Sequence, residues 1–384
     1  MQYFSSKHKL GILGGGQLGK MLLYNTRKFD IHSSVLDPSG EAPSKIACDV
    51  FVMGDLMDFE TVYSFAKDLD TLTIEIENVN VEALKALEEK GVKVYPASKT
   101  LAVIQNKALQ KQFYIEHELP TAAFKTYQNL KTLEKAIGSG LQSTPFVWKS
   151  SRFGYDGNGV KIIHNNADLS ELPKGECIAE ALIPFKNELA VIVARNPSGS
   201  IKSYPVVEME FHPEANQVEY VLCPARISNA ISKKATDVAL KVAAAFEHVG
   251  LLAVEMFLTQ DEDILINEVA PRPHNSGHQT IEANYTSQFE QHLRAVLNLP
   301  LGSTKNKVSG VMVNLVGAEG HHGAVVYKNI ENIMEFEGVT PHIYGKKQTR
   351  PFRKMGHVTI VNPNIEKARE IAQKVKESIK VISE

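Results

Sequence analysis

Two glutamates, Glu255 and Glu268, each lie in a short apolar run in the second half of the chain. If the runs form a hairpin with Thr259 opposite Ile264, the two carboxylates face each other across neighbouring strands. Opposed like charges on apolar strands are destabilising unless a shared proton or a cation lies between them. Mg²⁺ takes one or two carboxylates and completes its shell with phosphate oxygens, so the spacing favours a metal site. Strict alternation puts Asn267 on the opposite face.

The turn that follows these strands is dense in groups that bind oxyanions and move protons. Residues 270–278 have the sequence APRPHNSGH. Its prolines end the strand and stiffen the turn, which carries a guanidinium, two imidazoles, an amide and a hydroxyl. Such a cluster, directly after a strand that bears a carboxylate, is typical of a site that holds a small oxyanion.

A glycine-rich loop is the best candidate for a phosphate-binding segment. Gly154, Gly157 and Gly159 fall within six positions, and Lys149 ends the predicted strand before them. Backbone N–H groups of such a loop can contact a polyanion, and a lysine adds a point charge. The loop exceeds the usual hairpin length of about two to five residues, which favours a function. Lys107, on a predicted helix, indicates nothing by itself.

A second candidate for nucleotide binding follows this loop. The strand that contains Glu180 leads into a proline turn, and Glu188 comes shortly after it. Backbone groups there could bind a purine edge, and a carboxylate could bind ribose hydroxyls. Taken alone, both glutamates are more typical of a solvated surface.

The segment GGGQLG, residues 14–19, matches the G-x-G-x-x-G pattern of dinucleotide-binding proteins. It opens a predicted helix, and Asp37 ends the second strand, where such proteins keep a ribose-binding acid. Many βαβ units need glycines only to turn tightly, and nothing downstream resembles a hydride-transfer site. The helix N-terminus can equally bind another ligand.

On the fourth strand, Glu75 and Glu77 would share one face, at a ligand crevice or on a solvated edge.

The elements that must position these groups begin with alternating strands and helices. Strands are predicted at 10–13, 31–36, 50–53, 71–76 and 92–95, and helices at 17–27, 58–69 and 81–90. Repeated β-α-β alternation implies a parallel sheet with right-handed crossovers. We therefore expect an α/β protein whose first domain, 1–98, is Rossmann-like.

From residue 99 the pattern changes. One helix is predicted at 99–117, then short strands at 146–149, 160–163, 177–183, 189–194 and 203–207, which is typical of antiparallel sheet. A helix at 233–248 precedes the strands 253–258 and 264–269, and a charged helix near 365–379 follows towards the end. The helix leads to Pro120, where we expect a domain boundary. The later strands predict a largely antiparallel sheet, in which the strands of Glu255 and Glu268 would carry the metal site.

Composition narrows the class of partner. The 384 residues carry 42 basic and 44 acidic side chains, a net charge of −2, which gives no electrostatic footprint for nucleic acid or an anionic membrane. The three cysteines are widely spaced, which argues against disulfides and a zinc site and fits a reducing cytosol. No secretory segment or membrane span is predicted. A cytoplasmic protein with small-molecule partners is expected.

Taken in order, these segments resemble the ATP-grasp superfamily and, within it, the N5-carboxyaminoimidazole ribonucleotide synthases of purine biosynthesis. The resemblance covers nearly the whole chain through GGGQLGKML, TIEIENV, QNKALQKQF, GYDGNG, LLAVEMF, ILINEVAPRPHNSGH, SQFEQHLRAVLNLPLG and RPFRKMGH. It implies an ATP-grasp fold, with a linker helix and small α+β lid at 99–184 and a C-terminal α+β domain at 185–384 that carries the metal site. It also implies a carbon–nitrogen ligase that joins bicarbonate to 5-aminoimidazole ribonucleotide. ATP would become ADP and phosphate through carboxyphosphate.

The resemblance also implies roles toward ATP and Mg²⁺. Lys107 and Lys149 would contact the phosphates, Glu188 the ribose, and Glu255 and Glu268 one or two Mg²⁺ ions. The loop over the phosphates would comprise Gly154, Tyr155, Asp156, Gly157, Asn158 and Gly159. The adenine hinge would comprise Glu180, Ala181, Leu182 and Ile183, and His212 and Asn267 would complete the ATP site.

Toward the other substrates, Arg272 would hold bicarbonate or carboxyphosphate, and His274 would move a proton. The ribonucleotide's base and ribose would contact Gln17, Leu18, Glu75, Tyr155, Asp156, Asn275 and Ser276 as well as Arg272 and His274. Lys346 and Arg353 would clamp its 5′-phosphate, with Lys347 as the alternative to Lys346. The family's loop commonly has the sequence GGYDGRG; Phe153 and Asn158 depart from it, which leaves any role of that arginine open.

The resemblance further implies a homodimer that passes its product to a separate mutase, because no mutase domain is fused to the chain. Three alternatives remain: a formate-dependent glycinamide ribonucleotide transformylase of the same superfamily, a NAD-binding oxidoreductase, and a non-catalytic nucleotide-binding scaffold. The HNSGH continuation and Gln17 favour the carboxylase over the transformylase. An oxidoreductase would leave Glu255 and Glu268 without a role.

Overall fold

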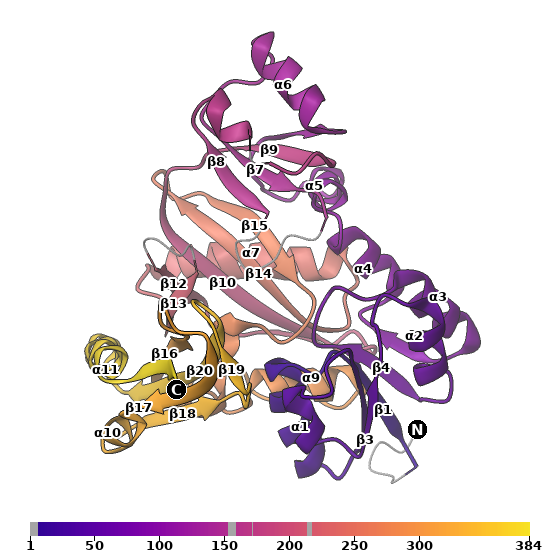
Figure 1. Ribbon diagram of the computed structural model, residues 1–384, viewed down its shortest axis with the longest axis vertical. Helices are drawn as coiled ribbons and strands as arrows, with labels where there is room; N and C mark the ends of the chain where they lie inside the picture. The colour runs from indigo at the N-terminus through magenta and orange to yellow at the C-terminus, as the bar shows by residue number, and fades with distance from the viewer. Residues whose placement is uncertain (1–6, 153–158, 171, 213–216) are drawn as a thin grey trace.

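The structure is a computed structural model that describes residues 7–152, 159–170, 172–212 and 217–384. Its N-terminal sheet is parallel, in the order β3-β2-β1-β4-β5. The strands are β1 (Lys9–Leu13), β2 (His32–Asp37), β3 (Val50–Met53), β4 (Thr71–Ile74) and β5 (Lys93–Tyr95), and the helices are α1 (Gln17–Lys28), α2 (Phe59–Ala66) and α3 (Val81–Lys90). This arrangement confirms the predicted Rossmann-like sheet, which lies at the lower right of Figure 1.

Two details of this region differ from the prediction. The fourth strand ends at Ile74, so Glu75 and Glu77 lie on a bend and strand alternation does not decide where they point. The single helix expected at 99–117 is two helices, α4 (Ser98–Ile104) and α5 (Lys107–Glu116). The break occurs because the Asn106 side chain accepts hydrogen bonds from the N–H groups of Ala108 and Leu109, which starts a new helix.

A small antiparallel sheet, in the order β6-β9-β7-β8, forms the upper part of the molecule (Figure 1). It comprises β6 (Phe124–Tyr127), β7 (Phe146–Ser150), β8 (Val160–Ile163) and β9 (Cys177–Ala181), with α6 (Leu130–Gly138) and a 3-10 turn, η2 (Asn166–Leu169). Phe146 and Trp148 pack with Leu133 of α6 in its core. The strand predicted at 177–183 ends at Ala181, two residues short of the predicted end.

The large sheet carries most of the remaining strands, in the order β15-β14-β10-β12-β13-β16-β20-β18, with β11 paired to β10. They are β10 (Phe185–Arg195), β11 (Ile201–Ser203), β12 (Val207–Phe211), β13 (Val218–Cys223), β14 (Gly250–Thr259), β15 (Ile264–Ala270), β16 (Ser309–Val316), β18 (Val339–Ile343) and β20 (Lys354–Asn362). All its pairings are antiparallel, as predicted. The strand predicted at 203–207 is wrong, because the chain turns there between β11 and β12.

Two helices pack on the end of this sheet formed by β15, β14 and β10. α7 (Asn229–Ala245) packs its apolar face on β10, β14 and β15, and α9 (Gln288–Val296) lies beside α1 (Figure 1). Shorter elements are η1 (Pro43–Ile46), η3 (Asn275–Gly277), α8 (Thr280–Ala283) and α10 (Ile330–Met334); a third antiparallel sheet joins β19 (Gln348–Thr349), β17 (Gly323–Lys328) and β21 (Lys380–Ser383). Across the described ranges, no helix combines the length and apolar character that crossing a membrane requires.

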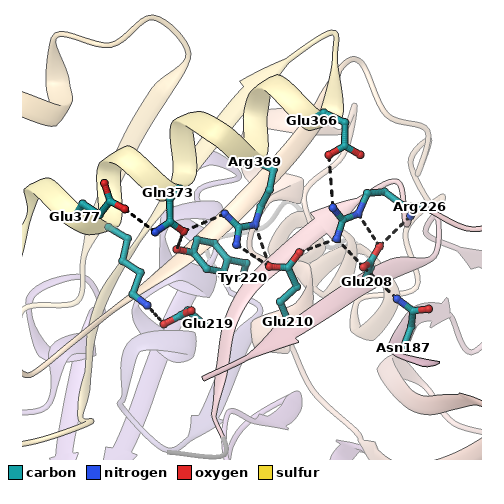
Figure 2. A network of polar contacts seen from close by, with 11 residues as sticks. Asn187, Glu208, Glu210, Glu219, Tyr220, Arg226, Glu366, Arg369, Gln373 and Glu377 are labelled. Atoms are coloured by element: carbon teal, nitrogen blue, oxygen red, sulfur yellow. Dashed lines mark hydrogen bonds and ion pairs between the residues drawn. The ribbon is translucent and has the colours of Figure 1, made fainter. Parts of the chain in front are cut away.

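The helix α11 (Ile365–Ser378) is fastened to the large sheet by a polar network (Figure 2). The Arg369 guanidinium lies 3.7 Å from the centroid of the Tyr220 ring and donates to Glu210. Arg226 contacts Glu210 as well, and reaches Glu366 on the helix. Partly buried pairs that share partners in this way hold the helix in register on β12 and β13. The domain boundaries at 98 and 184 stay predictions.

Candidate active site

The two opposed carboxylates are the centre of the site. Glu255 of β14 pairs with Glu268 of β15, as predicted, but not for the predicted reason. Near the turn Leu258, not Thr259, pairs with Ile264, and a β-bulge between Glu255 and Met256 restores the pairing of the glutamates. The prediction of the turn register was therefore wrong by one residue, and the bulge corrects it.

The bulge also decides which way Asn267 points. Ile266 and Val269 both pack in the core under α7, so the two residues between them, Asn267 and Glu268, turn to the other face together. The Asn267 side-chain oxygen accepts a hydrogen bond of 2.9 Å from Lys149 Nζ. Strict alternation put Asn267 on the opposite face; that expectation was wrong because the bulge adds one residue to β15.

The charges around the pair are unequal. Lys107, the first residue of α5, forms an ion pair and hydrogen bond with Glu268 and holds the pKa of that carboxyl below its usual range. Glu255 is in the opposite situation: burial, and then the charges of Glu268 and Glu188, raise its pKa. Glu188 is in turn raised to a pKa of about 7 by burial and the charge of Glu268.

This donor set fits a hard divalent cation. Two opposed carboxylates and a neighbouring amide oxygen are oxygen ligands of the kind Mg²⁺ prefers. A cation bound beside Glu255, whose pKa is raised, would favour the charged form of that carboxyl. Within the described part of the chain, no group of three or more His, Cys, Asp and Glu side chains could hold a metal ion. The set therefore suits an ion that takes its other ligands from phosphate and water.

A buried ion triad lies beside the pair. The Glu180 carboxylate, 3% exposed, contacts Lys149 Nζ and Lys111 Nζ at 2.9 Å each. Lys111 also donates to Thr121, whose hydroxyl donates to the backbone of Ile266 in β15. The triad joins the lid to the bulged strand, so it sets where Lys149 lies relative to Glu268.

Sequence reasoning missed Lys111, although a signal was present: it lies four positions after Lys107, on the same helix face. The rest of the predicted adenine hinge lies at the edge of the lid, where Ala181 ends β9 and Leu182 is exposed. Gly154, Tyr155, Asp156, Gly157 and Asn158 lie outside the described residues. Gly159, at φ +79°, accepts a hydrogen bond from Ser150, and Ser151 accepts one of 2.8 Å from the Lys107 N–H at the base of the loop.

The N-terminal glycine turn is filled by the protein's own carboxylates. Glu75 accepts a 3.0 Å hydrogen bond from the Gly19 N–H at the start of α1, and Asp37 accepts one of 2.7 Å from Gly15. A Cβ at Gly16 would lie 2.7 Å from Glu75 Oε1, so the glycine is needed for this approach. Glu75 thus occupies the position where a dinucleotide's pyrophosphate would bind. This geometry contradicts the dinucleotide interpretation.

The turn after β15 lies against two carboxylates, those of Glu77 and Glu255. Arg272 Nε lies 2.9 Å from Glu77, and His274 Nε2 lies 3.2 Å from Glu255. The Ser276 N–H donates to His274 Nδ1, and Nε2 is the ring nitrogen that faces Glu255. Asn275 exchanges two amide hydrogen bonds with Asn314 of β16.

The remaining predicted residues lie around the rim. Gln17 and Leu18 open α1, next to Glu75. Lys346 is partly buried and donates to the Lys354 carbonyl, whereas Lys347 points outward to Glu41. The position of Lys346 therefore favours it over Lys347.

Two others lie at the ends of strands. Arg353 donates to the Gln348 carbonyl and precedes β20. His212 follows β12, with its ring edge towards Phe352 at 6.1 Å between centroids. The role of His212 toward ATP stays a prediction.

Three family models match successive parts of the chain. Residues 7–105 match the ribonucleotide synthetase preATP-grasp domain, 112–289 the ATP-grasp domain, and 310–371 the phosphoribosylaminoimidazole carboxylase C-terminal domain. The chain is 38% identical to the N5-carboxyaminoimidazole ribonucleotide synthase of Bacillus subtilis, over 95% of this chain and 94% of that protein.

Solved structures of proteins with the same activity in their names are also similar to this chain. The N5-carboxyaminoimidazole ribonucleotide synthetase of Thermotoga maritima is 42% identical, with a TM-score of 0.90, over 98% of this chain and 100% of that chain. The Aspergillus clavatus enzyme, solved with ADP and 5-aminoimidazole ribonucleotide, is 34% identical with a TM-score of 0.87, over 97% and 98%. The chain belongs to the N5-carboxyaminoimidazole ribonucleotide synthase family of the ATP-grasp superfamily.

Proposed function

We propose that this chain ligates bicarbonate to the exocyclic amine of 5-aminoimidazole ribonucleotide, with ATP becoming ADP and phosphate. Members of the family, whose name states the product, catalyse this reaction in purine biosynthesis. The observation that supports it here is one arrangement: Glu255 lies opposite Glu268, with Lys107 and Lys149 beside them and His274 against Glu255. A phosphate-handling site and an oxyanion- and proton-handling turn thereby share one edge of the large sheet.

ATP would lie between the lid and the large sheet. Lys107 and Lys149 would contact its phosphates, and Glu188, near the start of β10, would bind its ribose hydroxyls. Glu255 and Glu268, with Asn267 beside them, would hold Mg²⁺. When bound, the metal neutralises phosphate charge during transfer.

The carboxylation itself needs an oxyanion site and a proton acceptor. Transfer of the γ-phosphoryl group to a bicarbonate oxygen gives carboxyphosphate, whose C–O bond breaks to release CO₂ and phosphate. The amine then attacks the carbon of CO₂ and loses a proton. Arg272, pinned by Glu77, suits the planar oxyanion, and His274 suits the proton step.

The ribonucleotide would lie between the N-terminal domain and the 270–278 turn. Gln17, Leu18 and Glu75 stand on the N-terminal side, and Asn275 and Ser276 on the other. Lys346 and Arg353 offer positive charge for its 5′-phosphate. A cytosolic homodimer that passes its product to a separate mutase is part of the same proposal; it rests on the cysteine pattern and the family resemblance.

One assay tests the proposal. Phosphate release from ATP with Mg²⁺ is measured with 5-aminoimidazole ribonucleotide and bicarbonate, and separately with glycinamide ribonucleotide and formate. We expect stimulation by the first pair only. Stimulation by the second pair would establish the transformylase instead, and the absence of stimulation by either pair would reject a ligase of this kind.

A further inference from the structure

The buried amide of Gln288 contacts the main chain of His274 on both sides. The His274 N–H donates to Gln288 Oε1 at 2.8 Å, and Gln288 Nε2 donates to the His274 carbonyl at 2.7 Å. The side chain is 0% exposed. A donor and an acceptor on the same residue fix which end of the amide is oxygen, so the pairing has one possible orientation.

The same amide reaches the far end of the turn. Gln288 Nε2 lies 3.0 Å from His278 Nδ1. Burial lowers the pKa of His278 well below its usual value, so the ring is neutral and accepts the bond. A Cβ at Gly277 would lie 2.6 Å from Gln288 Oε1, so the glycine makes room for the glutamine.

The anchor for this amide is the helix α9, of which Gln288 is the first residue. The Gln288 N–H donates to Thr280 Oγ1 at 2.8 Å, and Thr280 donates to the Gly277 carbonyl. The turn between His274 and His278 is therefore tied to a helix that packs against α1 and β14. A turn of mostly irregular backbone owes its position to these bonds.

We propose that Gln288 is a positioning residue of the carboxylation, which holds the His274 imidazole against Glu255 through the His274 main chain. The inference rests on the proposed role of His274. Without the amide, the His274 N–H and C=O groups lose their partner, and the imidazole loses its fixed distance to Glu255. Small misplacements of a reacting group can lower rates by about 100-fold.

The chain offers a matched control on the same helix. Gln291 is also 0% exposed, and its amide clamps a backbone in the same way: it accepts from the Gly302 N–H at 2.8 Å and donates to the Gly302 carbonyl at 3.1 Å. Gly302 lies outside the predicted site. A loss that is only structural would affect Gln288 and Gln291 variants alike.

The test compares Gln288→Glu with Gln291→Glu in the carboxylation assay. The carboxylate introduced by Gln288→Glu keeps the acceptor for the His274 N–H but cannot donate to its carbonyl or to His278. We expect kcat to fall on the order of 10- to 100-fold with KM for ATP within about two-fold, while Gln291→Glu keeps kcat within about two-fold at a similar loss of Tm. Equal kcat for the two variants would overturn the proposal.

A double variant separates action through His274 from other routes. His274→Ala combined with Gln288→Glu should be no slower than His274→Ala alone, because both changes remove the same function. Additive losses would overturn the route through His274. If Gln288→Glu does not fold, Gln288→Asn, whose shorter neutral amide cannot span both backbone groups, takes its place with the same expected loss of kcat. An inactive wild-type enzyme would instead refute the proposed function.

Discussion

Glu268 differs from Glu255 in one respect that matters for binding a cation: a lysine neutralises it. Lys107 holds Glu268 charged, whereas the pKa of Glu255 is raised by burial and by its acidic neighbours. A cation that binds between them would therefore keep Glu255 charged and compete with Lys107 for Glu268. The two carboxylates are unequal ligands despite their symmetric place in the hairpin.

Replacing Glu268 by glutamine is expected to abolish turnover and leave the fold intact. The amide keeps the shape but removes the negative charge that a cation and Lys107 both require. We expect phosphate release to fall at least about 100-fold. The far-ultraviolet circular dichroism spectrum should match the wild type. Retained activity would refute the metal assignment.

At the scale of elements, one inserted residue in β15 sets up the site. Two apolar residues of that strand, Ile266 and Val269, are three positions apart, yet both face α7. Only a bulge lets this spacing occur on one face. The bulge places an amide oxygen next to a carboxylate, and so gives Lys149 a partner on the edge that faces the lid.

The start of α1 depends on a similar fit. Gly16→Ala would place a Cβ against the Glu75 carboxylate, which must then leave the N–H groups it accepts from. We expect a loss of about 1–3 kcal/mol in the free energy of unfolding, measured by urea titration.

Gly138→Ala is the control for this change. Gly138 lies in the helix α6, and a Cβ there would meet nothing within 4 Å. The control should be neutral or stabilise by up to about 1 kcal/mol. Equal stability of the two variants would contradict the close packing of Glu75 against α1.

At the scale of the whole molecule, a buried histidine joins two sheets. His292 of α9 accepts from the Leu251 N–H at β14 through Nδ1, and its Nε2 lies 2.8 Å from the Thr73 hydroxyl of β4. The ring is 0% exposed, and burial lowers its pKa to about 3. His248, also buried, has a pKa lowered to about 4.

These two histidines predict acid sensitivity. Their folded pKa values lie below the unfolded value of about 6.5, so the unfolded chain binds the extra protons first. Stability is therefore full above about pH 6.5 and declines as the pH falls, to about pH 4 for His248 and to about pH 3 for His292. At about pH 5 each histidine is expected to lower the free energy of unfolding by about 2 kcal/mol.

The measurement is the free energy of unfolding at about pH 7 and about pH 5, for the wild type and His292→Gln. The variant loses the titrating ring, so its stability should depend less steeply on pH in this window. An unchanged slope would show that His292 does not titrate as its burial requires.

The sequence alone determined the features that depend on local periodicity. Alternating apolar runs predicted the parallel sheet and the strands of Glu255 and Glu268, because burial of one face requires that spacing. The turn at 270–278 could be identified from residue types alone. Family resemblance supplied the substrates, which no local pattern encodes.

Only the tertiary structure decided which side chains far apart in the sequence contact each other. Lys149 contacts Asn267 across 118 positions, and Lys107 contacts Glu268 across 161. Such pairs form only when separate sheets pack together, and no spacing along the chain specifies them. The bulge, the Glu180 triad and the Gln288 clamp belong to this class, since each satisfies buried polar groups that sequence patterning leaves without a partner.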